Sequence, residues 1–529
     1  MHPLQRLSPR LLSLALLLAL LLIACTGDEP VEVRPDAEFP TDSSASDTGA
    51  PPDAGPEAPP DGTLPTHARE LPFDYQRTDQ GAPVSPAELQ AVTDRYLEVL
   101  SGTRYFDVVA ERVHGWPESD PEGRYWYGSW WSGITVRKSG GRVTYHHSAD
   151  GADNNGLRTA PLLEGACYAS SLWGDAGDVH LTRTLMRGFI SWSLAMRRHG
   201  ADPEEFLLSR AAYPESVVDT ALDLTIDYSL NRPGEDGSAS EYVYIPTNPT
   251  WPNLWVKNKR SKDDMGHMLR AIAQLDSCAG SFGDAAAEAE LIEMRRLYQG
   301  WSRRVEDDRW GIATLTQDHE VTIPGETLAH FVDVSNIECT GILAVRLMGR
   351  QNAGGRDCGD GIGPVEEGLD EIRGSNMQIL RTFHEAAANL ALLMNDGPLA
   401  RQLLEGLATR LDVIMDRYEA GDPPPNANVG DFAALLIHSA NAGVPLTSRE
   451  VRWLHARIDE AHATYLAPAA MAQYRIFDAS TPDGEYLYEP SQPNIDFKDL
   501  GALLGSCASQ YQNPNGRPLL DCDRVRAAR

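Results

Sequence analysis

The spacing of apolar residues along the chain predicts a mainly helical protein. Across most of the sequence, apolar side chains recur every three or four positions, the period that places them on one face of an α-helix. Three of these stretches also begin with residues that favour a helix start: Ser85 precedes one, and Pro214 and Pro398 lie in the first turns of two others. The predicted helices span residues 86–100, 181–198, 214–230, 263–278, 285–304, 376–394, 398–418, 429–440 and 448–465.

Strand patterns are fewer and shorter. Residues 134–137 and 143–147 flank the sequence Ser139-Gly140-Gly141, which predicts a β-hairpin, and residues 310–315 could form a further short strand. Helices joined by long loops predict a mainly α fold of stacked helical hairpins with this small β-hairpin insertion. An α/α toroid with a concave face is the preferred architecture. An irregular all-α domain with β insertions is the alternative.

An apolar run of a different kind opens the chain. Arg6 and Arg10 precede an apolar run over residues 11–24, which is short for a membrane span and typical of a signal peptide. The run ends in Leu22-Ile23-Ala24-Cys25, which resembles the lipobox of bacterial lipoprotein signals. The resemblance covers residues 1–25 and implies cleavage before Cys25, diacylglyceryl on its thiol and acylation of the new amino terminus. The alternative is an ordinary secretory signal followed by a chance cysteine.

The next segment has the composition of a spacer. Residues 26–70 hold 9 Pro, 11 acidic residues, 2 Arg and a single aromatic residue, Phe39. Such a segment cannot bury enough apolar surface to offset the entropy lost on ordering, so we expect a disordered, acidic tether. The predicted organisation is a signal peptide over residues 1–24, the lipidated Cys25 with its tether over residues 25–70, and one large helical domain over residues 71–529.

Charge and localisation restrict the partners. The chain carries 46 Lys and Arg against 76 Asp and Glu, a formal net charge of −30, which argues against nucleic acid as a partner. The expected partner is a lipid bilayer, reached through acylated Cys25. Thr26, in place of an Asp, favours an outer membrane within the cell envelope.

The cysteines predict disulfides. Without Cys25 an even number remains in a chain expected to be exported: Cys167, Cys278, Cys339, Cys358, Cys507 and Cys522. We favour the pairs Cys339–Cys358 and Cys507–Cys522, which close short loops, leaving Cys167–Cys278. No spacing typical of a zinc site occurs, and no metal site is predicted.

The densest polar segment lies at residues 257–267, where the helix predicted from residue 263 begins. Helical spacing places Asp263, His267 and Arg270 opposite the apolar face. A carboxylate from Asp263 or Asp264, one turn before His267, would orient its ring and raise its basicity, as a general acid or base requires. The alternative is a solvated helix face.

Residues just upstream extend this candidate site. Trp251 and Trp255 would form platforms for sugar rings, and Arg260 and Lys262 would hold an acidic sugar.

Two further polar segments are weaker candidates. In residues 376–394, Arg381 and His384 lie near an apolar stripe, where they either line a cleft or are core residues satisfied by neighbours. Residues 150–156 resemble a cation-binding loop in composition but fail the EF-hand spacing, so an Asx-rich turn is the simpler interpretation. If that loop faced the same cleft, Arg158 and His146 or His147 could contribute to the site.

The absence of familiar motifs narrows the function. The sequence has no G-x-S-x-G, no H-E-x-x-H, no phosphate-binding Gly-rich loop followed by Lys-Ser/Thr, and no G-x-G-x-x-G after a strand. These absences argue against the usual serine hydrolases, metalloproteases, kinases and dinucleotide enzymes.

Two hypotheses therefore remain. Helix number, aromatic loops and the segment 260–267 make the body similar to toroidal glycan-active enzymes. That resemblance implies a surface-tethered polysaccharide lyase or glycosidase with His267, Asp263 and Asp264 at its centre. The other hypothesis is a non-catalytic binding or scaffold lipoprotein. The sequence indicates no particular cofactor.

Overall fold

The computed structural model describes most of the chain beyond residue 76. The described residues are 77–79, 81–106, 109, 134–146, 155–214, 216–219, 224–227, 242–250, 252–257, 262–275, 278–325, 331, 336–350, 352, 383–394, 396–423, 429–467, 480–488, 495–507 and 518–528. All of them belong to one compact unit, Ala58–Arg529. The predicted signal peptide, Cys25 and tether lie outside the described residues, so the lipoprotein and domain predictions stay predictions.

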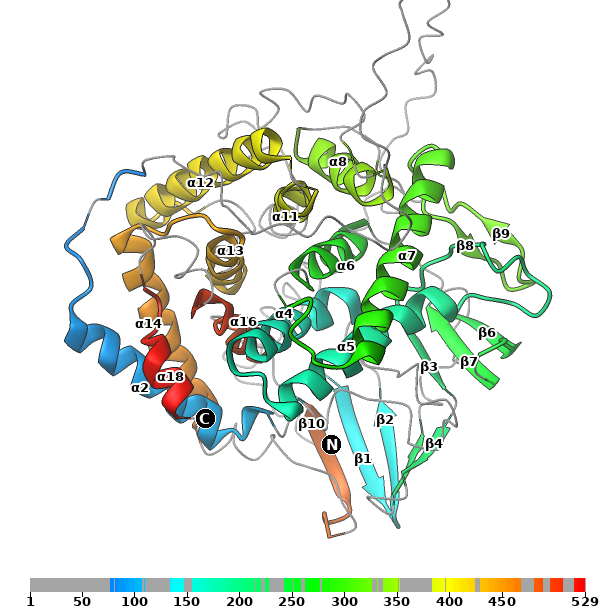
Figure 1. The fold of residues 1–529 in the computed structure, drawn as a ribbon. Coiled ribbons are helices and arrows are strands. Elements are labelled where there is room, and N and C mark those ends of the chain that lie inside the picture. Colours follow the sequence, from blue (N-terminus) through cyan, green and yellow to red (C-terminus); the bar gives the residue numbers. More distant parts are fainter. Residues whose placement is uncertain are drawn as a thin grey trace, which may run out of the picture. The chain divides into compact units, whose positions relative to one another are not determined.

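The described part is mainly helical, as predicted (Figure 1). The helices are α2 (Pro86–Gly102), α4 (Asn155–Trp173), α5 (Ala176–Leu194), α6 (Lys262–Gln274), α7 (Ala285–Asp307), α8 (Asn336–Arg350), α11 (Glu385–Leu393), α12 (Gly397–Ala420), α13 (Val429–Ala442), α14 (Ser448–Tyr465), α16 (Phe497–Ala502) and α18 (Cys522–Ala527).

Five of these helices form a closed inner ring. In ring order, α4 contacts α6, α6 contacts α11, α11 contacts α13, α13 contacts α16, and α16 returns to α4. Helices α2, α5, α7, α8, α12 and α14 lie around them (Figure 1). The ring therefore brings α4 into contact with α16, whose residues follow it by more than 300 positions.

The inner helices α4 and α6 run in the same direction. The N–H of Leu157 contacts Asp264 near the starts of α4 and α6, and Tyr168 contacts Gln274 further along both helices. Between α4 and α16 the backbones meet closely, because a Cβ at Gly165 would lie 2.6 Å from the backbone of Gly501. Helix α5, which follows α4 along the chain and packs against it, is one of the outer helices (Figure 1).

The sequence did not predict helix α4. Its residues from Thr159 to Ser170 are buried almost without interruption, so no polar face marks the helical period. Pro161 and the Asn-Gly start also favour a turn when only the sequence is read. The prediction of an Asx-rich turn over residues 150–156 is therefore wrong for its last two residues, because Asn155 and Gly156 begin this helix.

The predicted helix at residues 214–230 is wrong. The chain there forms short strands, and β4 (Ser216–Asp219) pairs antiparallel with β5 (Leu224–Asp227). Pro214 resembles a helix start, but the valines at positions 217 and 218 favour extended backbone.

The predicted hairpin is present. It joins β1 (Ile134–Ser139) to β2 (Arg142–His146) through Gly140 and Gly141, whose positive φ angles of 56° and 79° suit a tight two-residue turn. The hairpin belongs to a five-stranded sheet ordered β10-β1-β2-β5-β4, where β10 is Gly484–Tyr488.

Two smaller sheets complete the described strands. One orders β3 (Ala212–Pro214), β7 (Pro252–Lys257) and β6 (Tyr242–Thr247), and the other pairs β8 (Thr314–Leu315) with β9 (Val321–Thr322). The strand predicted at residues 310–315 is therefore shorter than expected.

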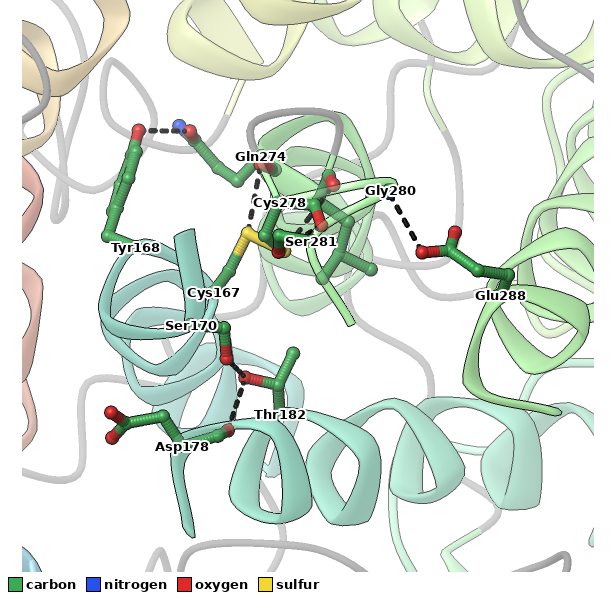
Figure 2. Close-up of a disulfide and its surroundings, with 11 residues drawn as sticks. Cys167, Tyr168, Ser170, Asp178, Thr182, Gln274, Cys278, Gly280, Ser281 and Glu288 are labelled. Atoms are coloured by element: carbon green, nitrogen blue, oxygen red, sulfur yellow. Dashed lines mark hydrogen bonds between the residues drawn. A yellow bond between two sulfur atoms is a disulfide. The ribbon is translucent and has the colours of Figure 1, made fainter. Parts of the chain in front are cut away.

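Disulfides tie the helices together. Cys167 of α4 bonds to Cys278, which follows α6 (Figure 2), and Cys507 bonds to Cys522 at the start of α18. Cys339 is also disulfide-bonded, and its predicted partner, Cys358, lies outside the described residues.

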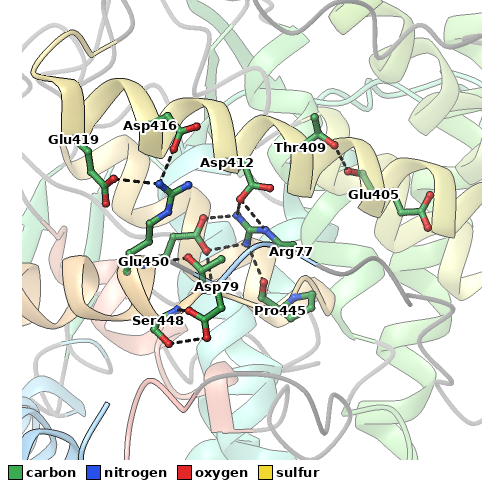
Figure 3. A network of polar contacts seen from close by, with 12 residues as sticks. Arg77, Asp79, Glu405, Thr409, Asp412, Asp416, Glu419, Pro445, Ser448 and Glu450 are labelled. Carbon is green, nitrogen blue, oxygen red and sulfur yellow. Dashed lines mark hydrogen bonds and ion pairs between the residues drawn. The ribbon is translucent and has the colours of Figure 1, made fainter. Parts of the chain in front are cut away.

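The first described residues clamp the outer helices. The guanidinium of Arg77 donates hydrogen bonds to Asp412 of α12, Glu450 of α14 and the carbonyl of Pro445 (Figure 3). Asp79 accepts from the backbone N–H and the hydroxyl of Ser448 at the start of α14. We call this contact set the Arg77 clamp.

Candidate functional site

Helix α6 turns its polar residues inward. The sequence left open a solvated face, but Asp264, His267 and Arg270 are all almost completely buried. The reason is that α6 is an inner helix, with α4 and α11 on either side and α8 behind it. A solvated face is therefore wrong for these residues. Of Asp263 only the backbone is described.

The starts of α4 and α6 bring two polar segments of the sequence together. The N–H of Leu157 donates to Oδ1 of Asp264 at 2.8 Å. A Cβ at Gly156 would meet Met268 at 2.8 Å and Asp264 at 3.1 Å, so only glycine allows this approach. Asn155 is buried beside them. A carboxylate there also complements the positive end of the α4 dipole.

Arg210 comes to the same place from a third segment. Its Nε lies 3.8 Å from Oδ2 of Asp264. Hydrogen bonds hold the backbone on both sides of it: Ser209 donates to the carbonyl of Trp192, and Ala211 accepts from the N–H of Lys257. We call Asn155, Arg210 and Asp264 the ring-end site.

Deeper in the ring lies a second polar cluster, the central network. Every inner helix contributes to it: Glu164 from α4, Arg270 from α6, Glu385 from α11, His438, Ser439 and Asn441 from α13, and Asp499 from α16. All of these side chains are buried.

A histidine between two carboxylates forms one half of the central network. Nδ1 of His438 lies 2.6 Å from Glu164, and its Nε2 lies 3.5 Å from Asp499. Burial and Arg270 oppose a charged imidazole, but the two carboxylates outweigh them and raise the pKa of His438. Burial alone would raise the pKa of Glu164, yet His438 and Arg270 bring it below its ordinary value. The pair is therefore ionic.

The other half of the network contains a carboxyl group of the opposite character. Burial raises the pKa of Glu385 to about 7, even though Arg270 and His438 favour its charged form. Its oxygens accept from the Ser439 hydroxyl at 2.9 Å and from Nη1 of Arg270 at 3.3 Å. Glu164 and Glu385 thus differ in protonation near neutral pH within one cluster.

His384 is a core residue satisfied by its neighbours, one of the two alternatives that the sequence left open. It is buried in a π-helical turn before α11, and its Nε2 lies 2.5 Å from the carbonyl of Leu403. Burial, followed by the charge of Arg410, lowers its pKa to about 3. An imidazole that is neutral and bonded to the backbone cannot provide a positive charge for substrate binding. Arg381 lies outside the described residues.

The remaining predicted residues fall into three groups. Trp255 of β7 is half-buried, and its ring lies 4.8 Å from that of Tyr244. Lys262 is buried at the start of α6. Trp251 and Arg260 lie outside the described residues, so their roles stay predictions.

Sequence reasoning missed Glu164, Glu385 and His438. A signal was nevertheless present for Glu164 and His438, because each is an isolated titratable residue inside an apolar run, as in Leu-Leu-Glu-Gly-Ala for Glu164; Glu385 instead directly follows His384. Buried charges require partners, so such residues in separate helices predict mutual contact. The described residues contain no group of three or more His, Cys, Asp or Glu side chains that could hold a metal ion. Among the described helices, none combines the length and apolarity needed to cross a membrane.

Comparisons with known proteins give little further information. No protein-family model matches the chain, and a search of curated proteins found no match. The catalytic domain of Clostridium thermocellum CelT is similar over 80% of this chain and 98% of that chain, at 10% sequence identity and a TM-score of 0.35.

Proposed function

We propose that this protein is an envelope lipoprotein whose helical domain is an α/α toroid that acts on carbohydrate, as a polysaccharide lyase or a glycosidase. The lipobox Leu22-Ile23-Ala24-Cys25 supports the anchor. The closed ring of inner helices, enclosed by outer helices, supports the toroid. The site of action is the end of the ring where α4 and α6 begin.

One observation carries the catalytic part of the proposal. Two polar segments more than 100 residues apart in the sequence meet at Leu157 and Asp264, and a third segment brings Arg210 to the same carboxylate. Folding gains little from gathering polar groups at a helix end that a single capping residue would satisfy. Convergence of this kind is typical of a functional site placed on rigid elements.

The chemistry follows from α6 itself. Asp264 and His267 lie one turn apart on this helix, the spacing at which a carboxylate and an imidazole act together. In the proposed reaction His267 transfers the proton and Asp264 supports its charge, which is general acid-base catalysis. The half-buried Trp255 on β7 offers an indole face for a sugar ring.

The test is a polysaccharide degradation screen on the full-length protein in detergent. Neutral and acidic polysaccharides are supplied, and both new reducing ends and unsaturated products are followed. We expect Asp264→Asn and His267→Gln each to lower the rate by roughly 10²- to 10⁴-fold while circular dichroism stays unchanged. Glu405→Gln is the control, at a half-buried position on α12 that pairs with Arg401 of the same helix. Activity retained in both variants would reject the site.

A non-catalytic scaffold is the second candidate, and the burial of His267 favours it. A scaffold predicts that no polysaccharide in the screen is degraded and that the Asp264→Asn variant keeps its binding partners. Pull-down of the anchored protein with immobilised glycans would then report binding without turnover.

A further inference from the structure

Arg210 is the least satisfied buried cation near the ring-end site. Its side chain is 10% exposed, and Nε is fully enclosed without a hydrogen bond. Within the described part of the chain its one charged contact is with Oδ2 of Asp264, at 3.8 Å, which is beyond hydrogen-bonding distance. The Nε–H of Arg210 is therefore a buried donor with little to bind, and Nη1 and Nη2 carry the other four N–H donors of the guanidinium.

Such an arrangement is costly unless a ligand completes it. Burying a guanidinium without hydrogen bonds sacrifices its hydration, and Asp264 at 3.8 Å restores only part of that loss. The same carboxylate already accepts the N–H of Leu157, which holds it in place. Asp264 therefore attracts the charge of Arg210 but accepts no hydrogen bond from the guanidinium N–H groups.

The surroundings of Arg210 favour an anion. Lys257 lies beside it in the β-ladder, since its N–H donates to the carbonyl of Ala211, and Lys257 Nζ lies over the ring of Tyr242. Lys262 begins α6 two residues before Asp264. Lysines thus adjoin Arg210 along the β-ladder and Asp264 along α6, in a chain whose net charge is −30.

We propose that Arg210 binds the carboxylate of an acidic sugar, so that the ligand of the ring-end site is a uronic-acid-containing glycan. This inference rests on the proposed function for the identity of the ligand as a sugar. The guanidinium fork matches a carboxylate in plane and can donate two parallel hydrogen bonds to it. The exposed tenth of the side chain is the edge that the ligand reaches.

The experiment measures binding and not turnover. Full-length protein in detergent is titrated with sodium D-glucuronate, and with glucose as the neutral sugar of the same shape, at constant ionic strength. We expect glucuronate to raise the melting temperature in a saturable manner and glucose to leave it unchanged. Arg210→Met abolishes the shift. Arg210→Lys keeps the charge but lacks the fork, and weakens binding about tenfold or more.

Arg95→Met is the matched control, because Arg95 forms an exposed ion pair with Asp459 in which both side chains are 44% exposed. This variant should bind glucuronate as the native protein does. Equal shifts with glucuronate and glucose, or native binding by Arg210→Met, would overturn the inference. Circular dichroism of Arg210→Lys excludes misfolding as the cause. Glucuronate binding without glycan degradation would support Arg210 and reject the catalytic proposal, whereas degradation of neutral glycans alone would do the reverse.

Discussion

Two buried arginines show what separates a structural contact from a binding site in this protein. The side chain of Arg77 is 3% exposed, and that of Arg210 is 10% exposed. Arg77 donates to two carboxylates and a backbone carbonyl, whereas among the described residues Arg210 has only a distant carboxylate. The enclosed charge of Arg77 is matched by the fold itself. That of Arg210 is not matched within the described part of the chain, which is why we propose a ligand for it.

The Arg77 clamp should show the largest effect. Arg77→Ala leaves Glu450, whose side chain is fully buried, without its charge partner. We expect the free energy of unfolding to fall by about 3–5 kcal/mol, measured by urea denaturation. Arg95→Ala, at an exposed ion pair, should cost about 1 kcal/mol or less. Equal losses in the two variants would contradict the distinction.

The Glu385–Arg270 pair is an intermediate case, since one contact of 3.3 Å joins two buried groups. The pKa of Glu385 is about 7 in the folded protein, above its ordinary value of 4.5, so the folded state binds more protons between these values. The free energy of unfolding that this group contributes therefore falls as pH rises from 4.5 through 7.

Glu385→Gln removes this pH dependence, because glutamine resembles the protonated acid. Relative to the native protein, the variant should gain on the order of 3 kcal/mol between pH 4.5 and pH 8. Urea denaturation at both pH values measures the difference. A difference that does not change with pH would show that the carboxyl group titrates normally.

The second member of the clamp should have a smaller effect. Asp79→Ala removes the acceptor for the N–H and hydroxyl of Ser448 at the start of α14. The loss expected is about 1–2 kcal/mol, typical of a helix-terminal carboxylate. Asp79→Asn keeps an acceptor oxygen and should recover part of the loss, which thermal unfolding of both variants would reveal.

Arg210 should give the smallest change in stability. Arg210→Met gives up no hydrogen bond within the described part of the fold, and the N–H of Leu157 still donates to the Asp264 carboxylate that it leaves, so the free energy of unfolding should change by less than about 1 kcal/mol. Urea denaturation without added sugar is the measurement. A loss of stability as large as that of Arg77→Ala would mean that Arg210 stabilises the fold as Arg77 does, and would contradict its assignment as a ligand-binding residue.

Much of the helical architecture is predictable from the sequence because it depends on amphipathic periodicity. Helix α14 was predicted at the bounds that the structure gives, and its capping box from Thr447 to Glu450 explains the sharp start. Helix α4 escaped prediction since it is buried on all sides, and its apolar residues form no stripe. An inner helix that is buried on all sides therefore lacks the amphipathic periodicity by which an outer helix can be predicted.

The candidate site was predictable only in part. The sequence indicated Asp264, Lys262 and His267 through the density of polar residues, but it placed Arg270 with Asp263 and His267 on one polar face. The structure instead pairs Arg270 with Glu385, which lies 115 residues further along the chain. Arg210 stands alone in its segment, and its approach to Asp264 depends on the packing of β3 against β7. Contacts between distant segments leave no local pattern.

The closed ring has a consequence for the order of events during synthesis. Helix α4 packs against α16, whose residues follow it by more than 300 positions. The hydrogen bond from Arg77 likewise cannot form until Glu450, 373 residues later, has been synthesised. The first helices therefore lack a neighbour until almost the whole chain has been made. Chains with such non-local contacts fold slowly and expose apolar surface in the meantime. A polypeptide that emerges amino terminus first would remain incomplete, and open to aggregation and proteolysis, until its last helices arrive.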